Sequence, residues 1–265
     1  MIKIRFFLIL FILIFILTPY SRRFEGKTFL ISPEIDLENI PKIFNLKETK
    51  YNVDNEKYEY LFYRVADFSK KVMPLSFISR LFDDNIFFPM ELDDINYPAI
   101  LSNYFPKYSN NSNFEDFVYY DFKEKGGIYL LFLSDSIQRE TRFYYYKDPL
   151  ESLQSFYVQE KELINKNTPV ILFSDLSYQN FRKVSERADF VDYIINFQDF
   201  EQGDIFGKKI RNIKKDSNIL YKMDILFGNH GFLTFDFYEI PLEKIDSSLF
   251  MKRVIDTRRF SVDEK

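Results

Sequence analysis

The chain of 265 residues contains no cysteine, no tryptophan and a single histidine, His230. The absence of cysteine excludes disulfide bonds, thiolate metal sites and cysteine nucleophiles. With one histidine, a zinc site built on several imidazoles is impossible, and a Ser-His-Asp triad would have to use His230. Hydrolytic sites that depend on cysteine or on paired histidines are therefore excluded.

A clustered basic face is also missing, because 36 basic and 40 acidic residues are spread along the chain and give a net charge of −4. Nucleic-acid-binding proteins usually carry such a cluster, so we expect no nucleic acid as a partner. The densest basic segment, residues 208–215, is predicted to be a solvated loop between strands. With 46% hydrophobic residues, the chain is long enough to bury the core of one sizeable domain.

The N-terminus has the pattern of a targeting segment. Lys3 and Arg5 precede an uninterrupted apolar run of 12 residues, 6–17, and Arg22 and Arg23 follow it. A membrane-spanning helix needs roughly 20 apolar residues, whereas a signal-peptide core is shorter. We predict that residues 1–23 are a signal peptide or an N-terminal membrane anchor. The protein is then exported, and is either periplasmic or held at the inner membrane on its extracytoplasmic side.

The rest of the chain alternates between strand and helix patterns, which predicts an α/β protein with mixed sheets and covering helices. Strands are predicted at 28–32, 97–103, 117–122, 128–133, 169–173 and 190–197, with a hairpin of 219–227 and 232–240. Helices are predicted at 57–72, after Asp148, and at 178–187, and residues 104–116 are predicted to form a loop. We expect one domain over residues 24–258 and a polar tail over 259–265.

The helix after Asp148 has the clearest start signal in the chain. Asp148 is a favourable N-cap, Pro149 suits the first turn, and Glu151 places an acid near the positive end of the helix. The apolar spacing predicts a buried stripe made by Leu150, Leu153, Tyr157 and Ile164.

Three segments, 85–103, 169–179 and 189–201, resemble in order and setting the later segments of calcineurin-like metallophosphoesterases, especially of the 5′-nucleotidase type. Residues 96–103 (Asn-Tyr-Pro-Ala-Ile-Leu-Ser-Asn) are similar to a Phe-Pro-x-Leu-x-Ala-Asn strand of that family. Residues 188–195 (Ala-Asp-Phe-Val-Asp-Tyr-Ile-Ile) are similar to the strand before its last histidine motif. The resemblance implies an αββα sandwich, with functional groups on loops at the carboxyl ends of strands.

The histidines of the family motifs are absent at the matching positions. Met90 stands for the histidine of Gly-Asn-His-Glu, Asp175 for that of Ser-His, and Gln198 and Phe200 for the two of Gly-His-x-His. The family chemistry requires two metal ions about 3.5–4 Å apart, and Met90, Gln198 and Phe200 cannot together supply the roles of the missing histidines. We therefore expect no catalytic residues, no dinuclear metal site and no cofactor.

An oxygen-rich metal site remains as an alternative. In the resemblance, Glu34 and Asp36 match an Asp-x-His motif and Asp67 matches a Gly-Asp motif, while Glu91 and Asp175 are acids within the later motifs. Together these five carboxylates could hold Mg²⁺, Mn²⁺ or Ca²⁺, which accept oxygen ligands. Acids on loops are also ordinary solvated residues.

His230 lies in the sequence Gly228-Asn229-His230-Gly231 between the two strands of the predicted hairpin. Turn chemistry accounts for these residues, because Gly and Asn tolerate positive φ. We interpret the segment as a turn rather than as a catalytic site.

Taken together, the sequence predicts an exported or membrane-anchored, catalytically inactive metallophosphoesterase-like protein. It would act by binding, as a scaffold component of the cell envelope with a protein partner that the sequence does not name. The alternative is a metal-dependent phosphoester or nucleotide hydrolase using the oxygen-rich site. A third interpretation is an unrelated exported α/β protein.

Overall fold

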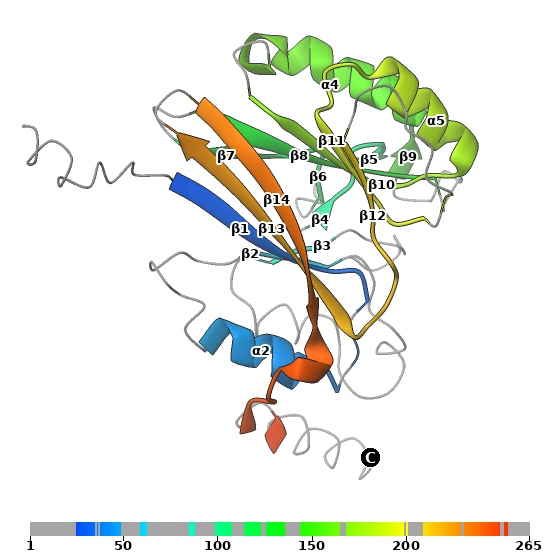
Figure 1. Cartoon of the computed structure of the whole chain (residues 1–265). Coiled ribbons are helices and arrows are strands. Elements are labelled where there is room, and N and C mark those ends of the chain that lie inside the picture. The colour runs from blue at the N-terminus through cyan, green and yellow to red at the C-terminus, as the bar shows by residue number, and fades with distance from the viewer. Residues whose placement is uncertain are drawn as a thin grey trace, which may run out of the picture.

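Two β-sheets stacked face to face form the centre of the molecule, with helices on both outer sides (Figure 1). The computed structural model describes residues 25–34, 36, 38–48, 59–62, 85–87, 99–107, 114–122, 126–135, 144–164, 168–198, 200, 209–228, 231–249 and 252–253. The layers run helix, sheet, sheet, helix, which is the αββα sandwich that the sequence predicts.

The first sheet has seven strands in the order β14-β13-β1-β2-β3-β4-β6. Its strands are β1 (Glu25–Ser32), β2 (Glu59–Phe62), β3 (Asn85–Phe87), β4 (Ala99–Ile100), β6 (Phe114–Glu115), β13 (Ile219–Gly228) and β14 (Gly231–Pro241). The strands β1, β2, β3, β4 and β6 are parallel, whereas β13 is antiparallel to β1 and forms a hairpin with β14. Helix α2 (Ile40–Glu48) lies on the outer side of this sheet and buries Ile40, Ile43 and Leu46 (Figure 1).

The second sheet has five strands in the order β12-β11-β10-β8-β7. Its strands are β7 (Val118–Asp121), β8 (Gly127–Ser134), β10 (Val170–Asp175), β11 (Tyr193–Asn196) and β12 (Lys209–Asn212). The strands β8, β10, β11 and β12 are parallel, and β7 is antiparallel to β8. Gly126 lies in the turn between β7 and β8 with a φ of 99°, a conformation that favours glycine. A separate pair, β5 (Tyr104–Pro106) with β9 (Tyr144–Tyr146), lies beside the sandwich, and a short 3₁₀ helix, η3 (Leu242–Lys244), follows β14.

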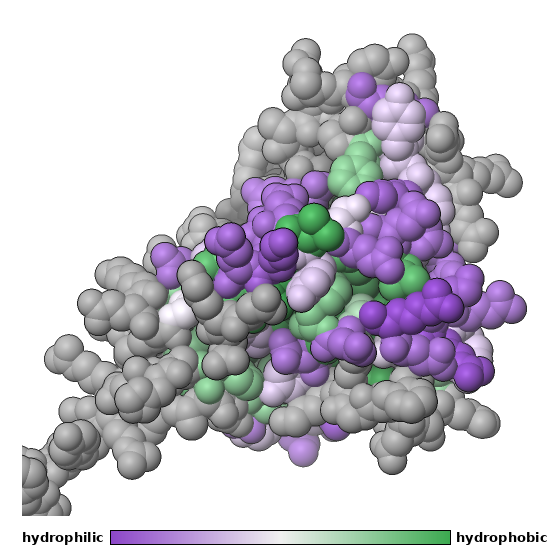
Figure 2. Space-filling model, turned by 90° about the horizontal axis from the view of Figure 1, so that it is seen from above, coloured by the Kyte–Doolittle hydropathy of each residue, from purple (hydrophilic) through white to green (hydrophobic). Residues whose placement is uncertain are grey.

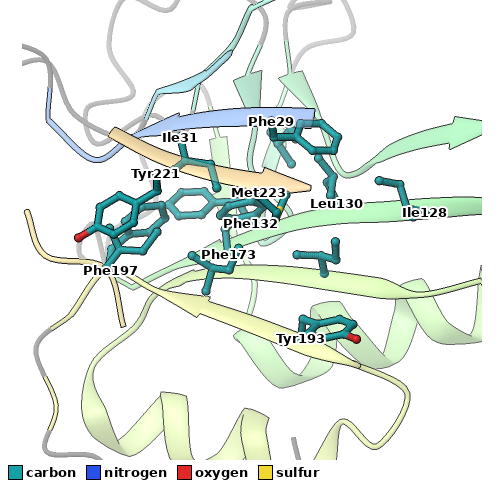
Figure 3. Packing of buried hydrophobic residues seen from close by; sticks show 14 of the residues in the cluster. Phe29, Ile31, Ile128, Leu130, Phe132, Phe173, Tyr193, Phe197, Tyr221 and Met223 are labelled. Carbon is teal, nitrogen blue, oxygen red and sulfur yellow. The ribbon is translucent and has the colours of Figure 1, made fainter. Parts of the chain in front are cut away.

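The main core lies between the two sheets. Alternate residues point inward, so that Phe29 and Ile31 of β1 share one cluster with Leu130 and Phe132 of β8 and with Phe173 of β10 (Figure 3). These five side chains are buried, and burying each stabilises the fold by roughly 1.5–3 kcal/mol. Apolar packing between the two sheets therefore holds the sandwich together.

A second core lies between the five-stranded sheet and helices α4 (Pro149–Ile164) and α5 (Tyr178–Arg187). Leu153 and Phe156 of α4 and Phe181 and Val184 of α5 pack on the outward-facing residues of β8, β10 and β11. The predicted cap of α4 is confirmed, because Asp148 Oδ1 accepts hydrogen bonds from the backbone N–H groups of Leu150 and Glu151, at 2.9 and 3.2 Å. Of the predicted buried stripe, Leu153 and Ile164 are buried, while Leu150 and Tyr157 are partly buried. Figure 2 shows the molecule from the side of these helices, where hydrophilic residues surround a small apolar area.

Three expectations from the sequence are wrong or incomplete. The predicted helix 57–72 contains a strand, β2, at Glu59–Phe62. Strands β5 and β6 lie within the predicted loop 104–116. The basic segment 208–215, predicted as a loop, contains strand β12. The β13–β14 hairpin is confirmed, and its turn residues Asn229 and His230 lie outside the described residues.

The predicted targeting segment 1–23 and the polar tail 259–265 also lie outside the described residues, and the domain limits stay a prediction. In the part of the chain that the structure describes, no helix is long and apolar enough to cross a membrane.

Candidate functional site

The carboxyl ends of the parallel strands of both sheets lie at one edge of the sandwich. After β4, the Asn103 side chain joins the two sheets: its Nδ2 donates to the carbonyl oxygen of Ser134 at 2.7 Å, and its Oδ1 accepts from the N–H of Ser134 at 3.1 Å. After β12, the N–H of Lys214 donates to the Tyr221 hydroxyl at 3.1 Å, and Tyr221 pairs with Ile31 near the end of β1. In α/β sheets this edge is where functional groups usually lie.

Asp175, the last residue of β10, is the central acid at this edge. Its side chain is only 1% exposed. Side chains alternate between the two faces of a strand, so Asp175 lies on the same inward face as Phe173, two residues before it. The Gln198 amide donates a hydrogen bond from Nε2 to Asp175 Oδ1. The Lys215 ammonium lies 3.8 Å from the same oxygen. Asp175 and Gln198, two positions where the resemblance implies histidines, are therefore hydrogen-bonded to each other, and the Lys215 ammonium lies beside them.

Side-chain amides fix the loop that carries Gln198. Asn196 Nδ2 donates to the Gln198 carbonyl oxygen at 2.6 Å and to Asn212 Oδ1 at 3.1 Å, and Asn196 Oδ1 accepts from the Gln198 N–H at 3.3 Å. Asn212 Nδ2 donates to the Phe200 carbonyl oxygen at 3.1 Å. Because Asn196 and Asn212 end neighbouring strands, β11 and β12, the loop is held by the sheet itself.

Phe200, the second replaced histidine of the last motif, packs as an apolar residue. Its ring lies 5.4 Å from the rings of both Tyr178 and Phe181, measured between centroids. The edge-on arrangement with Tyr178 is a favourable aromatic contact. The position therefore contributes to the packing of α5 against the loop.

Asp135 is a second buried carboxylate, directly after β8, and it binds the start of α5. It accepts hydrogen bonds from the Ser177 N–H at 2.7 Å, the Ser177 hydroxyl at 2.6 Å and the Asn180 amide at 2.8 Å. A carboxylate at a helix N-terminus satisfies free N–H groups and complements the helix dipole. Asp135 thereby fixes the segment that follows Asp175.

Two phenols lie near Asp135. Burial raises the pKa of Tyr146 to about 12, and the negative charges of Asp135 and Asp148 add to the shift. Burial also raises the pKa of Tyr104, with further contributions from Tyr146 and Asp135. The two rings meet edge to face, 5.2 Å between centroids. Both phenols are therefore neutral at physiological pH.

A cleft of about 710 Å³ opens next to Gln198 at the same edge. Three of its described lining residues are cationic and one is acidic. The lining residues are Phe197, Gln198, Phe200, Arg211, Asn212, Ile213, Lys214, Lys215 and Glu239. Arg211 and Glu239 lie across from each other, 3.5 Å apart, and both side chains are about half exposed.

The structure brings together only some of the residues that the sequence singles out. Asp175, Gln198 and Phe200 lie in one neighbourhood, linked through Gln198 and its loop. Glu34 and Asp36 lie in the segment after β1, where the Ser32 hydroxyl donates to the Glu34 carbonyl oxygen at 3.0 Å. Met90, Asp67 and Glu91 lie outside the described residues. The five-carboxylate site therefore stays an untested prediction.

Sequence reasoning missed four residues that shape the site: Asp135, Asn196, Asn212 and Lys215. A signal for two of them was available, because Asp135 directly follows β8 and Asn196 ends β11, and both strands are predicted from the sequence. Polar residues at such ends gather at one edge. Asn212 and Lys215 could not be placed, because the basic segment that contains both has the pattern of a solvated loop.

The described residues do not fit the dinuclear metal centre that the resemblance implies. Asp175 Oδ1 accepts from the Gln198 amide and faces the Lys215 ammonium, so the matching side chain of Gln198 presents an N–H group, not a ligand oxygen. Phe200 has no atom that can bind a metal. Within the described ranges, no three His, Cys, Asp or Glu side chains form a group that could hold a metal ion.

Comparison with known proteins finds similar proteins only through the structure. No model of a protein family matches the sequence, and no curated protein matches it. The sulfate thiohydrolase SoxB of Thermus thermophilus superposes with a TM-score of 0.58 at 10% identity, covering 87% of this chain and 47% of SoxB. A Staphylococcus aureus protein assigned as a 5′-nucleotidase superposes with a TM-score of 0.60 at 12% identity, covering 91% of this chain and 58% of that protein.

These similarities establish the fold. The chain has the metallophosphoesterase fold of the 5′-nucleotidase type, as the sequence predicts. It spans about half the length of the two structures that it matches.

Proposed function

We propose that this protein is an exported or membrane-anchored, catalytically inactive metallophosphoesterase-like protein that acts by binding, as a scaffold component of the cell envelope. The observation that carries the proposal is the Asp175–Gln198–Lys215 cluster. The carboxylate that a metal would need already accepts from an amide and lies 3.8 Å from an ammonium group of the chain itself.

The electrostatic argument is direct. A buried carboxylate requires compensation by hydrogen bonds, by a cation or by both. In a metallophosphoesterase site, metal ions would provide that compensation. In this chain Gln198 and Lys215 provide it, and a divalent cation at the same oxygen would be repelled by the neighbouring ammonium. The cluster therefore explains how the fold can persist without metal.

A metal-dependent phosphoester or nucleotide hydrolase is the second candidate. It is favoured by the names of the two structural neighbours, which are a thiohydrolase and a protein assigned as a nucleotidase. It would use oxygen ligands among Glu34, Asp36, Asp67, Glu91 and Asp175. Asp175 would then have to give up its contact with Lys215.

Phosphoesterase assays separate the two candidates. The full chain, purified in a non-ionic detergent, is incubated with p-nitrophenyl phosphate, bis(p-nitrophenyl) phosphate and adenosine monophosphate, each with Mn²⁺, Mg²⁺, Zn²⁺ or Ca²⁺. We expect rates equal to those of the Gln198→Ala and Asp175→Ala variants and of buffer. Metal-dependent turnover that both substitutions reduce would overturn the proposal.

The proposed location rests on residues 1–23 and has its own test. Membranes and periplasmic extract from cells that express the full chain are separated, and the mass of the mature protein is measured. A protein that starts near residue 24 indicates a cleaved signal peptide, and an intact chain in the membrane fraction indicates an anchor. An intact chain in the cytosol would contradict export.

A further inference from the structure

We infer that the cleft beside Gln198 binds a small organic anion with a doubly charged oxyanion head group, without any metal ion. The inference rests on the proposed function, because it assumes that cationic side chains of the chain, and not metal ions, bind the anion at the carboxyl ends of the strands. Arg211, Lys214 and Lys215 line the cleft, against one lining carboxylate among the described residues, Glu239.

The cations are placed by the fold. Arg211 lies on β12, and Lys214 and Lys215 follow this strand within three residues of its end at Asn212. The backbone that carries them is bonded on both sides: the Ile213 N–H donates to the Asn196 carbonyl oxygen at 2.8 Å, and the Lys214 N–H donates to the Tyr221 hydroxyl at 3.1 Å. The three cationic residues that line the cleft therefore belong to one segment, which is fixed to both sheets.

The cationic side chains of the rim are accessible from solvent. The Arg211 side chain is 48% exposed, and its 3.5 Å pair with the similarly exposed Glu239 contributes little. The Lys215 side chain is 29% exposed, and Lys214 is an exposed residue. An oxyanion in the cleft would gain charge-assisted hydrogen bonds from these groups.

The floor of the cleft has a different character from its rim. Phe197 and Ile213 are buried, 1% and 3% exposed, and Phe200 is partly buried. A volume of about 710 Å³ lies within the range of small-molecule sites, whereas a bare inorganic ion would fill little of it. An apolar body on the floor with its oxyanion among the rim cations fits both features.

The test is binding of phenylphosphonate, which is doubly charged and cannot be hydrolysed. The full chain in non-ionic detergent and EDTA is titrated by isothermal calorimetry. Inorganic phosphate, singly charged benzoate and neutral benzyl alcohol serve as comparison probes. We expect saturable binding of one phenylphosphonate per chain, weaker binding of phosphate and benzoate, and none of benzyl alcohol.

Matched variants locate the binding in the cleft. Lys214→Gln/Lys215→Gln is expected to lower the affinity by at least about tenfold, the loss that follows from removing charge-assisted hydrogen bonds. Lys161→Gln/Lys183→Gln removes the same charge from exposed positions on α4 and α5 and is expected to leave the affinity unchanged. Because Lys215 also contacts Asp175, Lys214→Gln alone is a second variant, with a smaller loss in the same direction.

Each remaining outcome is decisive. Equal affinity in the cleft variant and the control variant would overturn the inference. A second titration replaces EDTA with Mn²⁺, and no saturable binding in either titration would overturn the inference and leave the proposed function standing. Binding that requires Mn²⁺ would overturn both.

Discussion

Asp175 is a buried acid whose charge is compensated by other side chains of the same chain. Its carboxylate is compensated by the Gln198 amide and the Lys215 ammonium, so the residue is a structural element of the strand edge. A buried acceptor that loses its donor costs about 1–3 kcal/mol. The cost of disturbing this cluster can therefore be measured as stability.

Replacing Gln198 by alanine removes the donor to Asp175. We expect the free energy of unfolding to fall by about 1–3 kcal/mol, because the buried carboxylate then lacks a hydrogen-bond partner. Urea unfolding, followed by circular dichroism, measures the change. Gln179→Ala is the control, since Gln179 is exposed on α5. An equal effect of the two substitutions would show that the Gln198 amide does not stabilise the site.

The pKa shift of Tyr146 gives a prediction for alkaline solution. The phenol ionises near pH 10 in the unfolded chain and at about 12 in the folded protein. Its contribution to stability is therefore complete below pH 10 and is lost as the pH rises from 10 to 12. We expect the free energy of unfolding of Tyr146→Phe to fall less than that of the original chain between pH 9 and 11.

Tyr145 is a matched control for this comparison. It is the neighbouring residue, its side chain is 51% exposed, and Tyr145→Phe keeps the ring. The pH dependence of Tyr145→Phe is expected to follow that of the original chain. If Tyr146→Phe also followed it, the raised pKa of Tyr146 would not contribute to stability.

The residues of the candidate site were predictable where they lie at the ends of strongly apolar strands, and were not predictable elsewhere. Asp175 ends β10 and Gln198 lies two residues after the end of β11, and the register of parallel strands brings such positions together. Lys215 follows a strand, β12, with a single apolar residue, Ile210. A basic segment with so little apolar pattern is typical of a loop, so its lysines could not be placed at the site.

Helices α4 and α5 illustrate two kinds of start signal. The capping residue of α4 is local, since Asp148 lies just before the helix. The start of α5 is bound by Asp135, which lies 42 residues earlier in the chain. The first signal can be read in the sequence, whereas the second depends on the tertiary structure.

The cap of α4 provides a test of this distinction. Asp148→Ala is expected to lower the free energy of unfolding by about 1 kcal/mol, the usual cost of losing an N-cap. Glu162→Ala, at an exposed position in the last turn of the same helix, is expected to change it by less than about 0.5 kcal/mol. Thermal and urea unfolding measure both. A negligible effect of Asp148→Ala would mean that tertiary packing alone sets the start of α4.

The wrong helix at 57–72 has a physical cause. A short segment rich in aromatic and apolar residues, here Tyr-Glu-Tyr-Leu-Phe-Tyr at 58–63, is compatible with a strand and also satisfies part of a helical spacing. Its pairing with β1 decides in favour of the strand, and that contact between distant segments is not visible in the local pattern.

Across the whole molecule, the core and the functional edge meet in a few apolar residues. The inter-sheet cluster includes none of the positions where the resemblance implies histidines, but its members Phe197 and Ile213 also line the cleft. Substitutions of the polar residues Gln198 and Lys214 are therefore expected to leave the packing of the sandwich intact, whereas substitution of Phe197 or Ile213 would disturb it. The fold was predictable from the order of strands and helices, while the chemistry of the edge had to be judged residue by residue.

The most direct test of the central claim is the metal content of the protein. The full chain is dialysed separately against Mn²⁺, Zn²⁺, Mg²⁺ and Ca²⁺, and the bound metal per chain is measured by mass spectrometry. We predict no binding above that of the Asp175→Ala variant, because Gln198 and Lys215 already compensate the Asp175 carboxylate. Stoichiometric binding of any of these ions that the Asp175→Ala substitution abolishes would contradict the account.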